Sequence, residues 1–155
     1  TILMSLSLAL LTDDFHFDKL IVGHQDCWQF ENLAVATSKV LPRYITGKQN
    51  FDLSGVMCYD RRTDKQYYYD LDRFIYQITA GTAISWREAF DKVMVYWKST
   101  PRNYSAYAGM FTMNQDAKGL STYIPRMSAP SLNASYQQTE WYKVSGWADT
   151  GWYKN

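Results

Sequence analysis

The last fifteen residues of the chain, 141–155, hold three tryptophans and two tyrosines among polar residues and glycine. A short polar segment cannot bury five large rings within itself, because each ring has about 150–250 Å² of surface to remove from water. The rings must therefore pack on the rest of the chain, on another protein or on a ligand with a flat apolar face. We expect a globular domain of residues 1–140 and an aromatic C-terminal tail of residues 141–155 that docks on the domain or on a partner.

The composition is that of one folded domain. Of the 155 residues, 46% are hydrophobic and 20% are charged, which separates the chain from disordered sequences. The formal net charge of +1 gives no basic excess that would attract nucleic acid. No stretch reaches the ~18 uninterrupted apolar residues of a membrane-spanning helix. We therefore expect other protein subunits as partners, no nucleic acid and no transmembrane segment.

Two segments have the pattern of amphipathic helices. Residues 26–40 and 85–99 each begin with Asp or Ser followed three positions later by Gln or Glu, which is the spacing of a capping box. Apolar residues then recur at helical intervals, and a proline follows each predicted helix end. Residues 12–22 fit either a short helix or a strand.

Several other segments alternate between apolar and polar residues, as strands do. The predicted strands are residues 1–11, 51–59, 66–71, 74–78, 104–113, 120–124 and 141–144. The first of these has the tail of a signal sequence as its alternative, the second and third are predicted to pair as a hairpin, and residues 125–138 are predicted to be a loop. The expected fold is therefore a single α+β domain, with antiparallel β-hairpins packed on two main amphipathic helices and an aromatic-rich C-terminal tail.

Few residues have the types and spacing that chemistry needs. Asp14, His16 and His24 are of the types that bind zinc, but their spacing matches no recognised zinc pattern, so no metal and no cofactor are expected. His24 and Cys27 are three residues apart, so a base and a thiol nucleophile would meet there if the segment were helical. Cysteine on an apolar helix face is more often an inert hydrophobic residue.

The charged side chains near the predicted hairpin also allow chemistry. Asp70 and Asp72 would lie on one side of a strand, as a carboxylate pair does in a glycosidase, or simply at the exposed end of the hairpin. The basic residues at 61, 62 and 65 precede three tyrosines, so this tip could hold a phosphate or stack a base. Four nearby aspartates balance these charges, and a solvated turn explains them equally well.

Two features would fit a secreted protein. A disulfide between Cys27 and Cys58 would stabilise the domain by roughly 3–4 kcal/mol in the chain-entropy model. Asn103 and Asn133 each begin an Asn-X-Ser acceptor pattern for N-glycosylation.

A family resemblance rests on residues 55–125. Gly55 to Asp60, then Lys65 and the tyrosines 67–69, resemble the Gly…Asp…Lys-Tyr-Tyr hairpin of a small accessory subunit of mitochondrial respiratory complex I. The tryptophan-bearing stretch that ends at Pro101, and the stretch 120–125, are similar to later parts of that family, although Thr-Asp replaces the Gly-Asn turn of the family at residues 63–64. The resemblance implies a non-catalytic scaffold with no cofactor of its own.

The hypothesis that these patterns favour is a non-catalytic structural subunit of a larger assembly, with the aromatic tail and the apolar N-terminal segment as its interface. The expected contact anchors are Trp141, Trp147, Trp152 and Tyr153. One alternative is a secreted, disulfide-stabilised module that binds a glycan or a small apolar ligand. Others are the respiratory accessory subunit and an enzyme that uses His24 or His16. The sequence leaves open whether the protein belongs to an organellar assembly or is extracellular.

Overall fold

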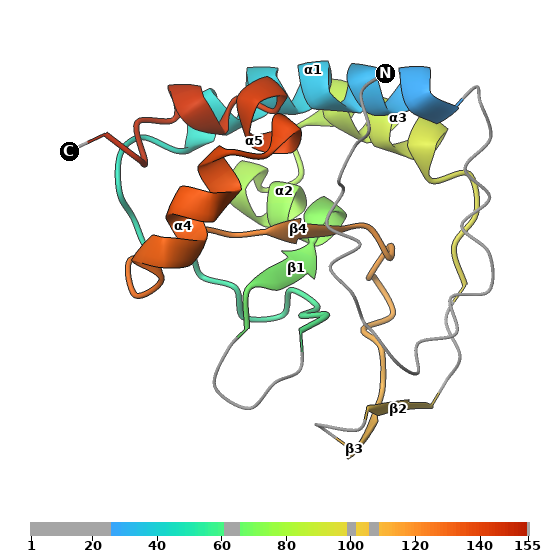
Figure 1. Cartoon of the computed structure of the whole chain (residues 1–155). Helices are drawn as coiled ribbons and strands as arrows, with labels where there is room; N and C mark the ends of the chain where they lie inside the picture. Colours follow the sequence, from blue (N-terminus) through green and yellow to red (C-terminus); the bar gives the residue numbers. More distant parts are fainter. Residues whose placement is uncertain (1–25, 61–65, 99–101, 106–108, 155) are drawn as a thin grey trace.

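The structure is a computed structural model, and it describes residues 26–60, 66–98, 102–105 and 109–154 (Figure 1). The predictions for residues 1–11 and 12–22 lie outside these residues. So do the side chains of residues 26–28, and with them the contacts of Cys27.

The long helix α1, Asp26–Tyr44, runs along one side of the molecule and packs against α3, Ile84–Val93 (Figure 1). The indole N–H of Trp86 joins the two helices by donating to the Thr37 hydroxyl at 2.9 Å. Both helices were predicted, with different ends. Helix α1 continues through Pro42, and α3 ends at Val93 rather than near residue 99.

The turn of α1 that precedes Pro42 is where the chain around Gly146 packs against the helix. Proline has no backbone N–H, so the carbonyl four residues earlier, on Ser38, receives no helical hydrogen bond from it. Gly146 packs against this turn, where a Cβ would lie 2.6 Å from the Ser38 Cα and 3.0 Å from its carbonyl oxygen. The chain therefore approaches α1 closely at the position where the helix has lost a bond, and only glycine has room there.

A small antiparallel sheet lies beneath the helices. Strand β1, Tyr68–Asp70, pairs with β4, Ser121–Tyr123. On its other side β1 meets residues 57–59 through an isolated bridge between Cys58 and Tyr69. This bridge is the pairing that was predicted between residues 51–59 and 66–71, reduced to a few residues. A second pair, β2 (Asn103–Ser105) and β3 (Gly109–Phe111), lies apart from the first.

The third predicted strand, residues 74–78, is wrong, because this segment belongs to the helix α2, Leu71–Thr79. Apolar residues at 71, 74, 75 and 78 have helical spacing, which the period-2 interpretation of 74, 76 and 78 missed. The Asp70 side chain caps the helix by accepting from the Arg73 N–H, and Ala80 ends it in the left-handed conformation.

Two predictions near the C-terminus are also wrong. Residues 125–138, predicted as a loop, contain the helix α4, Pro130–Gln137, with Pro130 in its first turn. Residues 141–144, predicted as a strand, lie in the helix α5, Glu140–Val144. The Thr139 hydroxyl caps α5 by accepting from the Tyr142 N–H. A short 3-10 helix, η1 (Trp147–Asp149), follows.

The main core lies between the helices and the β1–β4 sheet, and rings fill much of it. Trp147 stacks on Phe74 with ring centroids 6.2 Å apart, and Phe51 meets both rings edge-on. Trp152 donates its indole N–H to the Gln49 carbonyl, and Gly47 donates to the Thr150 carbonyl, so the last turns close onto the loop after α1. The predicted α+β fold class is confirmed. Among the described residues, no helix is long and apolar enough to cross a membrane.

Candidate functional site

The Asp70 carboxylate accepts four hydrogen bonds from three parts of the chain. It is fully buried, and one of its oxygens accepts from the Tyr59 hydroxyl and the Lys118 N–H, both at 2.7 Å, and from the Gly119 N–H at 3.1 Å. The other oxygen caps α2 through the Arg73 N–H at 2.9 Å. The carboxylate thus ties together the residue 57–59 segment, the start of α2 and the loop before β4.

Burial shifts the acid–base equilibria of this cluster. Loss of water raises the pKa of Asp70, and its four hydrogen bonds oppose that shift without cancelling it. Burial and the nearby Asp70 charge both raise the pKa of Tyr59, so its hydroxyl keeps the proton that it donates. Burial also raises the pKa of Asp72, which lies 2.6 Å from the Arg87 guanidinium. Asp70 and Asp72 therefore serve capping and ion pairing, and the glycosidase-like pair on one side of a strand is wrong.

A second, smaller apolar cluster lies next to the Asp70 carboxylate. Its buried members are Met57, Tyr59, Met113 and Ala117, and Trp97 and Phe111 pack against them. Gly119 lies under the Trp97 ring, where a Cβ would come within 2.1 Å of a ring carbon. Gly119 also has a φ of +84°, which other residues rarely adopt. The loop that Asp70 holds is therefore the surface on which Trp97 packs.

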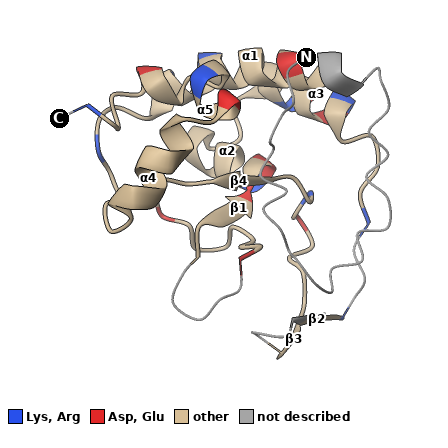
Figure 2. Cartoon of the chain, viewed as in Figure 1, with Lys and Arg blue, Asp and Glu red and all other residues tan. Residues whose placement is uncertain are grey.

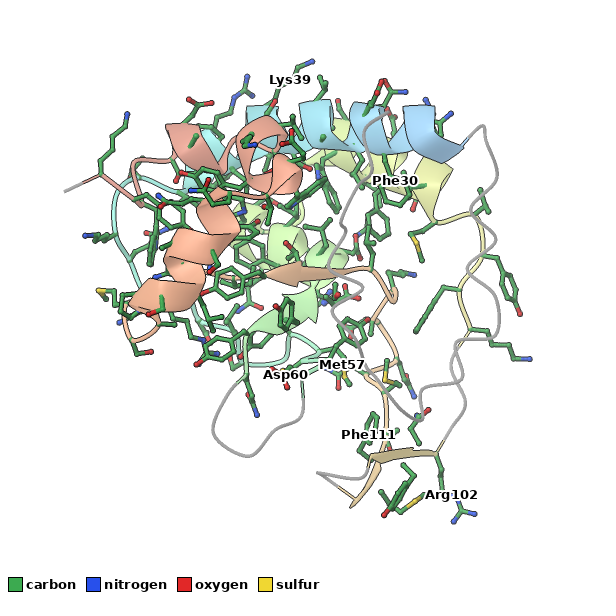
Figure 3. All side chains as sticks on the ribbon, in the orientation of Figure 1. Phe30, Lys39, Met57, Asp60, Arg102 and Phe111 are labelled. Carbon is green, nitrogen blue, oxygen red and sulfur yellow. The ribbon has the colours of Figure 1, made fainter. Side chains whose placement is uncertain are left out.

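This cluster anchors an extension that we call the arm, defined as residues 94–98, 102–105 and 109–113. The arm leaves the end of α3, includes β2 and β3, and returns to the loop before β4, away from the helices (Figure 1). Figure 3 labels Met57 at the body end of the arm, and Phe111 and Arg102 toward its far end. Four large apolar side chains on it are exposed: Val95, Tyr96, Tyr104 and Met110.

A recess lies beside the β1–β4 sheet. It is lined by rings, among them Phe30, Tyr123, Tyr136 and Trp141, and its volume is about 30 Å³. A buried water needs about 10–15 Å³, so the recess has room for about two or three water molecules. It is a packing gap among rings rather than a substrate pocket.

The four predicted anchors of the tail lie in or against the domain core. Trp147 and Trp152 are each 2% exposed, and Trp141 and Tyr153 are half-buried. Tyr153 meets the ring of the buried Tyr142 edge-on at 5.0 Å. These rings are therefore occupied by the domain itself, which was one of the two possibilities that the sequence left open.

The predicted disulfide and glycosylation sites have different surroundings. The Cys58 thiol donates a hydrogen bond to the Asp60 carbonyl at 3.1 Å. Because the Cys27 side chain lies outside the described residues, its pairing with Cys58 stays a prediction. Asn133 is buried, accepts from the Tyr123 hydroxyl and donates to the Arg126 carbonyl, so the folded domain leaves no room for a glycan there. Asn103 lies partly exposed in β2, and its modification stays a prediction.

The described part of the chain contains no histidine, since both histidines precede residue 26. Among the described side chains, no group of three His, Cys, Asp or Glu residues could hold a metal ion. The predicted metal candidates Asp14, His16 and His24 lie outside the described residues, as does the pairing of His24 with Cys27. The basic tip at residues 61–65 lies outside them too.

Comparison with known proteins gives evidence about function that the described side chains do not give. No protein-family model and no curated protein matches the chain. Among solved structures, a B. fragilis cysteine protease is 93% identical to it, with a TM-score of 0.79, over 82% of this chain and 53% of that chain. An inactive zymogen of a C11 protease from Parabacteroides distasonis is 22% identical, with a TM-score of 0.65, over 76% of this chain and 36% of that chain, and shares the fold. The chain thus spans about half the length of the solved cysteine protease.

This similarity corrects the functional hypothesis drawn from the sequence. A non-catalytic structural subunit is wrong, and so is the mitochondrial accessory subunit, because a solved chain of 93% identity is a cysteine protease. The predicted interface of the aromatic tail does not hold for the tryptophans Trp147 and Trp152, which are buried in the domain. These rings complete the core of the domain, so they gave no information about a partner.

Proposed function

We propose that this chain is part of a cysteine protease, an enzyme that cleaves peptide bonds through a cysteine thiolate. The observation that carries the proposal is the 93% identity to a solved cysteine protease over 82% of the chain. At that identity most core side chains are the same in the two chains, so we expect the two chains to pack into the same fold. The TM-score of 0.79 supports this.

Cysteine protease chemistry requires a base close enough to the thiol to take its proton. In a cysteine protease, a base takes the thiol proton, the thiolate attacks the peptide carbonyl carbon, and the amine leaves with a proton. Water then hydrolyses the acyl-enzyme and regenerates the thiol. Cys58 is half-buried against the β1 strand, and the described residues contain no imidazole to activate it. The base therefore comes from His16 or His24, or from the part of the protease that this chain does not match.

A chimera tests the proposal. The matching segment of the B. fragilis cysteine protease is replaced by this chain, and hydrolysis of peptide substrates is measured. We expect kcat/KM within about threefold of the parent enzyme, which corresponds to about 0.7 kcal/mol in transition-state stabilisation. A chimera that is folded by circular dichroism but inactive would contradict the proposal.

Two cysteine variants in the chimera show whether this chain supplies the nucleophile. Cys58→Ser is expected to leave kcat/KM unchanged, since the Cys58 thiol donates to the backbone carbonyl of Asp60 and a serine hydroxyl can do the same. Cys27→Ser is the matched comparison. If it alone abolishes hydrolysis and labelling by iodoacetamide, the nucleophile is Cys27. If neither variant changes the rate, the nucleophile belongs to the part of the protease outside this chain.

A further inference from the structure

We propose that the arm is a docking element, and that it binds an acidic face with apolar side chains on the part of the longer cysteine protease that this chain does not match. This inference rests on the proposed function. The relative's chain is long enough to provide the partner face, because the match covers only 53% of it.

The first argument is the exposure of the arm. Val95 is 85% exposed, Tyr96 73%, Met110 60% and Tyr104 59%. All four lie along the same extension of the domain, and exposed apolar surface that is concentrated in one region marks interaction sites. Tyrosine and methionine are also residue types that interfaces favour.

The second argument is the weak internal support of the arm. Strands β2 and β3 contain three residues each and, within the described part of the chain, form a two-stranded sheet with each other. A two-stranded hairpin is marginally stable at best in water, and three or more strands or a packed helix are needed to stabilise it. Trp97, Phe111 and Met113 pack in or against the small cluster at the body end. Contacts with a partner surface at the far end would therefore stabilise the hairpin.

The third argument is charge. Residues 93–113 contain Lys98 and Arg102 and no Asp or Glu, although the whole chain has a net charge of only +1. Figure 2 shows basic but no acidic positions on the described part of the arm. A face that complements the arm would therefore carry acidic groups around an apolar centre. Two cations are too few to indicate a nucleic-acid site, which needs a basic stripe.

Hydrogen exchange tests the proposal in the chimera and in this chain alone. We expect the amides of residues 102–105 and 109–111 to exchange at least about tenfold more slowly in the chimera, because docking stabilises the hairpin. Equal exchange in both proteins would overturn the proposal. Protection in the isolated chain that grows with protein concentration would identify a second copy as the occupant and would also overturn it.

Substitutions on the arm separate docking from general destabilisation. The double variant Tyr104→Ser/Met110→Ser should lose the protection in the chimera. Ile84→Ser is its matched control, because Ile84 is 70% exposed on α3 outside the arm. Lys98→Glu/Arg102→Glu should also reduce the protection, whereas Lys39→Glu on the outer face of α1 should not (Figure 3). Loss of protection in the controls as well would contradict the assignment.

The result is independent of the activity assay. An active chimera with an unprotected arm would overturn the docking proposal and leave the proposed function standing. An inactive, folded chimera whose arm is protected would do the reverse.

Discussion

The Asp70 carboxylate holds together parts of the chain that lie far apart in the sequence. It accepts hydrogen bonds from Tyr59, Arg73, Lys118 and Gly119, so one buried side chain fixes a helix start and a loop together. No periodicity reveals such a group. The sequence placed Asp70 at the end of a strand, and only the contacts between distant segments show that it is a buried cap.

Asp70→Asn is expected to lower the free energy of unfolding by about 2–3 kcal/mol near neutral pH. The amide replaces one acceptor oxygen with a donor, which leaves buried N–H or O–H groups without a partner. Urea denaturation followed by circular dichroism measures the change. The control Asp91→Asn alters an exposed carboxylate on α3 and should stay within about 0.5 kcal/mol of the parent.

The difference in stability between the parent and Asp70→Asn depends on pH, and the pKa shift of Asp70 gives the sign of this dependence. Because the folded pKa of Asp70 is raised above its ordinary value of 3.8, the folded state binds the proton more tightly than the unfolded state. The stabilisation from this group is therefore complete at low pH and declines as pH rises through the raised pKa. The stability gap between the parent and Asp70→Asn should shrink with rising pH, and a gap that widens would contradict the assignment.

The helices differ in how well the sequence predicts them. Helices α1 and α3 have long apolar stripes, and both were found from their periodicity. Helices α4 and α5 have 8 and 5 residues, too few for the helical period to exceed the two-residue period clearly. Helix α2 does have helical spacing, but its residues 74, 76 and 78 also fit a two-residue period. Their caps carry the missing information. Asp70 and Thr139 cap α2 and α5, but a cap can be recognised only after the helix is placed.

The C-terminal end of α2 offers a stabilising substitution. Ala80 has a φ of +48° and is the one non-glycine residue with positive φ among the described residues. The left-handed conformation costs a residue with a Cβ about 1–2 kcal/mol. Ala80→Gly should therefore raise the free energy of unfolding by about 0.5–1 kcal/mol, net of the extra chain entropy of glycine.

Thermal unfolding measures this effect, with Ala89→Gly as the opposite control. Ala89 lies inside α3, where glycine should cost about 1 kcal/mol. A fall in melting temperature for Ala80→Gly would show that the native backbone at that position does not favour glycine.

Across the whole domain, the C-terminal rings behave as core. Trp147 contacts Phe51, Phe74 and Tyr136, which come from three different parts of the chain. Composition predicted that the rings must be buried, but it could not choose between the domain and a partner. That choice depends on the shape of the surface which α1, α2 and α4 form together. The sequence did not predict the arm either, because exposed and half-buried strands both alternate between apolar and polar residues.

Trp147→Ala is expected to cost about 3–5 kcal/mol, because it leaves a large cavity beside Phe74. Trp141→Ala should cost clearly less, since Trp141 is only half-buried. Denaturant unfolding compares the two variants, and Trp147→Phe keeps the test informative if the alanine variant does not fold. Equal losses for Trp141 and Trp147 would contradict the distinction between rim and core.

The contact of Trp152 with Gln49 has a consequence for how the protein is made. The two residues are 103 positions apart, and Trp147 and Trp152 are core residues that cover α1 and its following loop. During synthesis, α1 leaves the ribosome long before the rings that bury its apolar face exist. The domain therefore cannot complete its core step by step from the N-terminus. Its N-terminal half stays incompletely folded, and exposed to proteases and chaperones, until residue 152 has emerged.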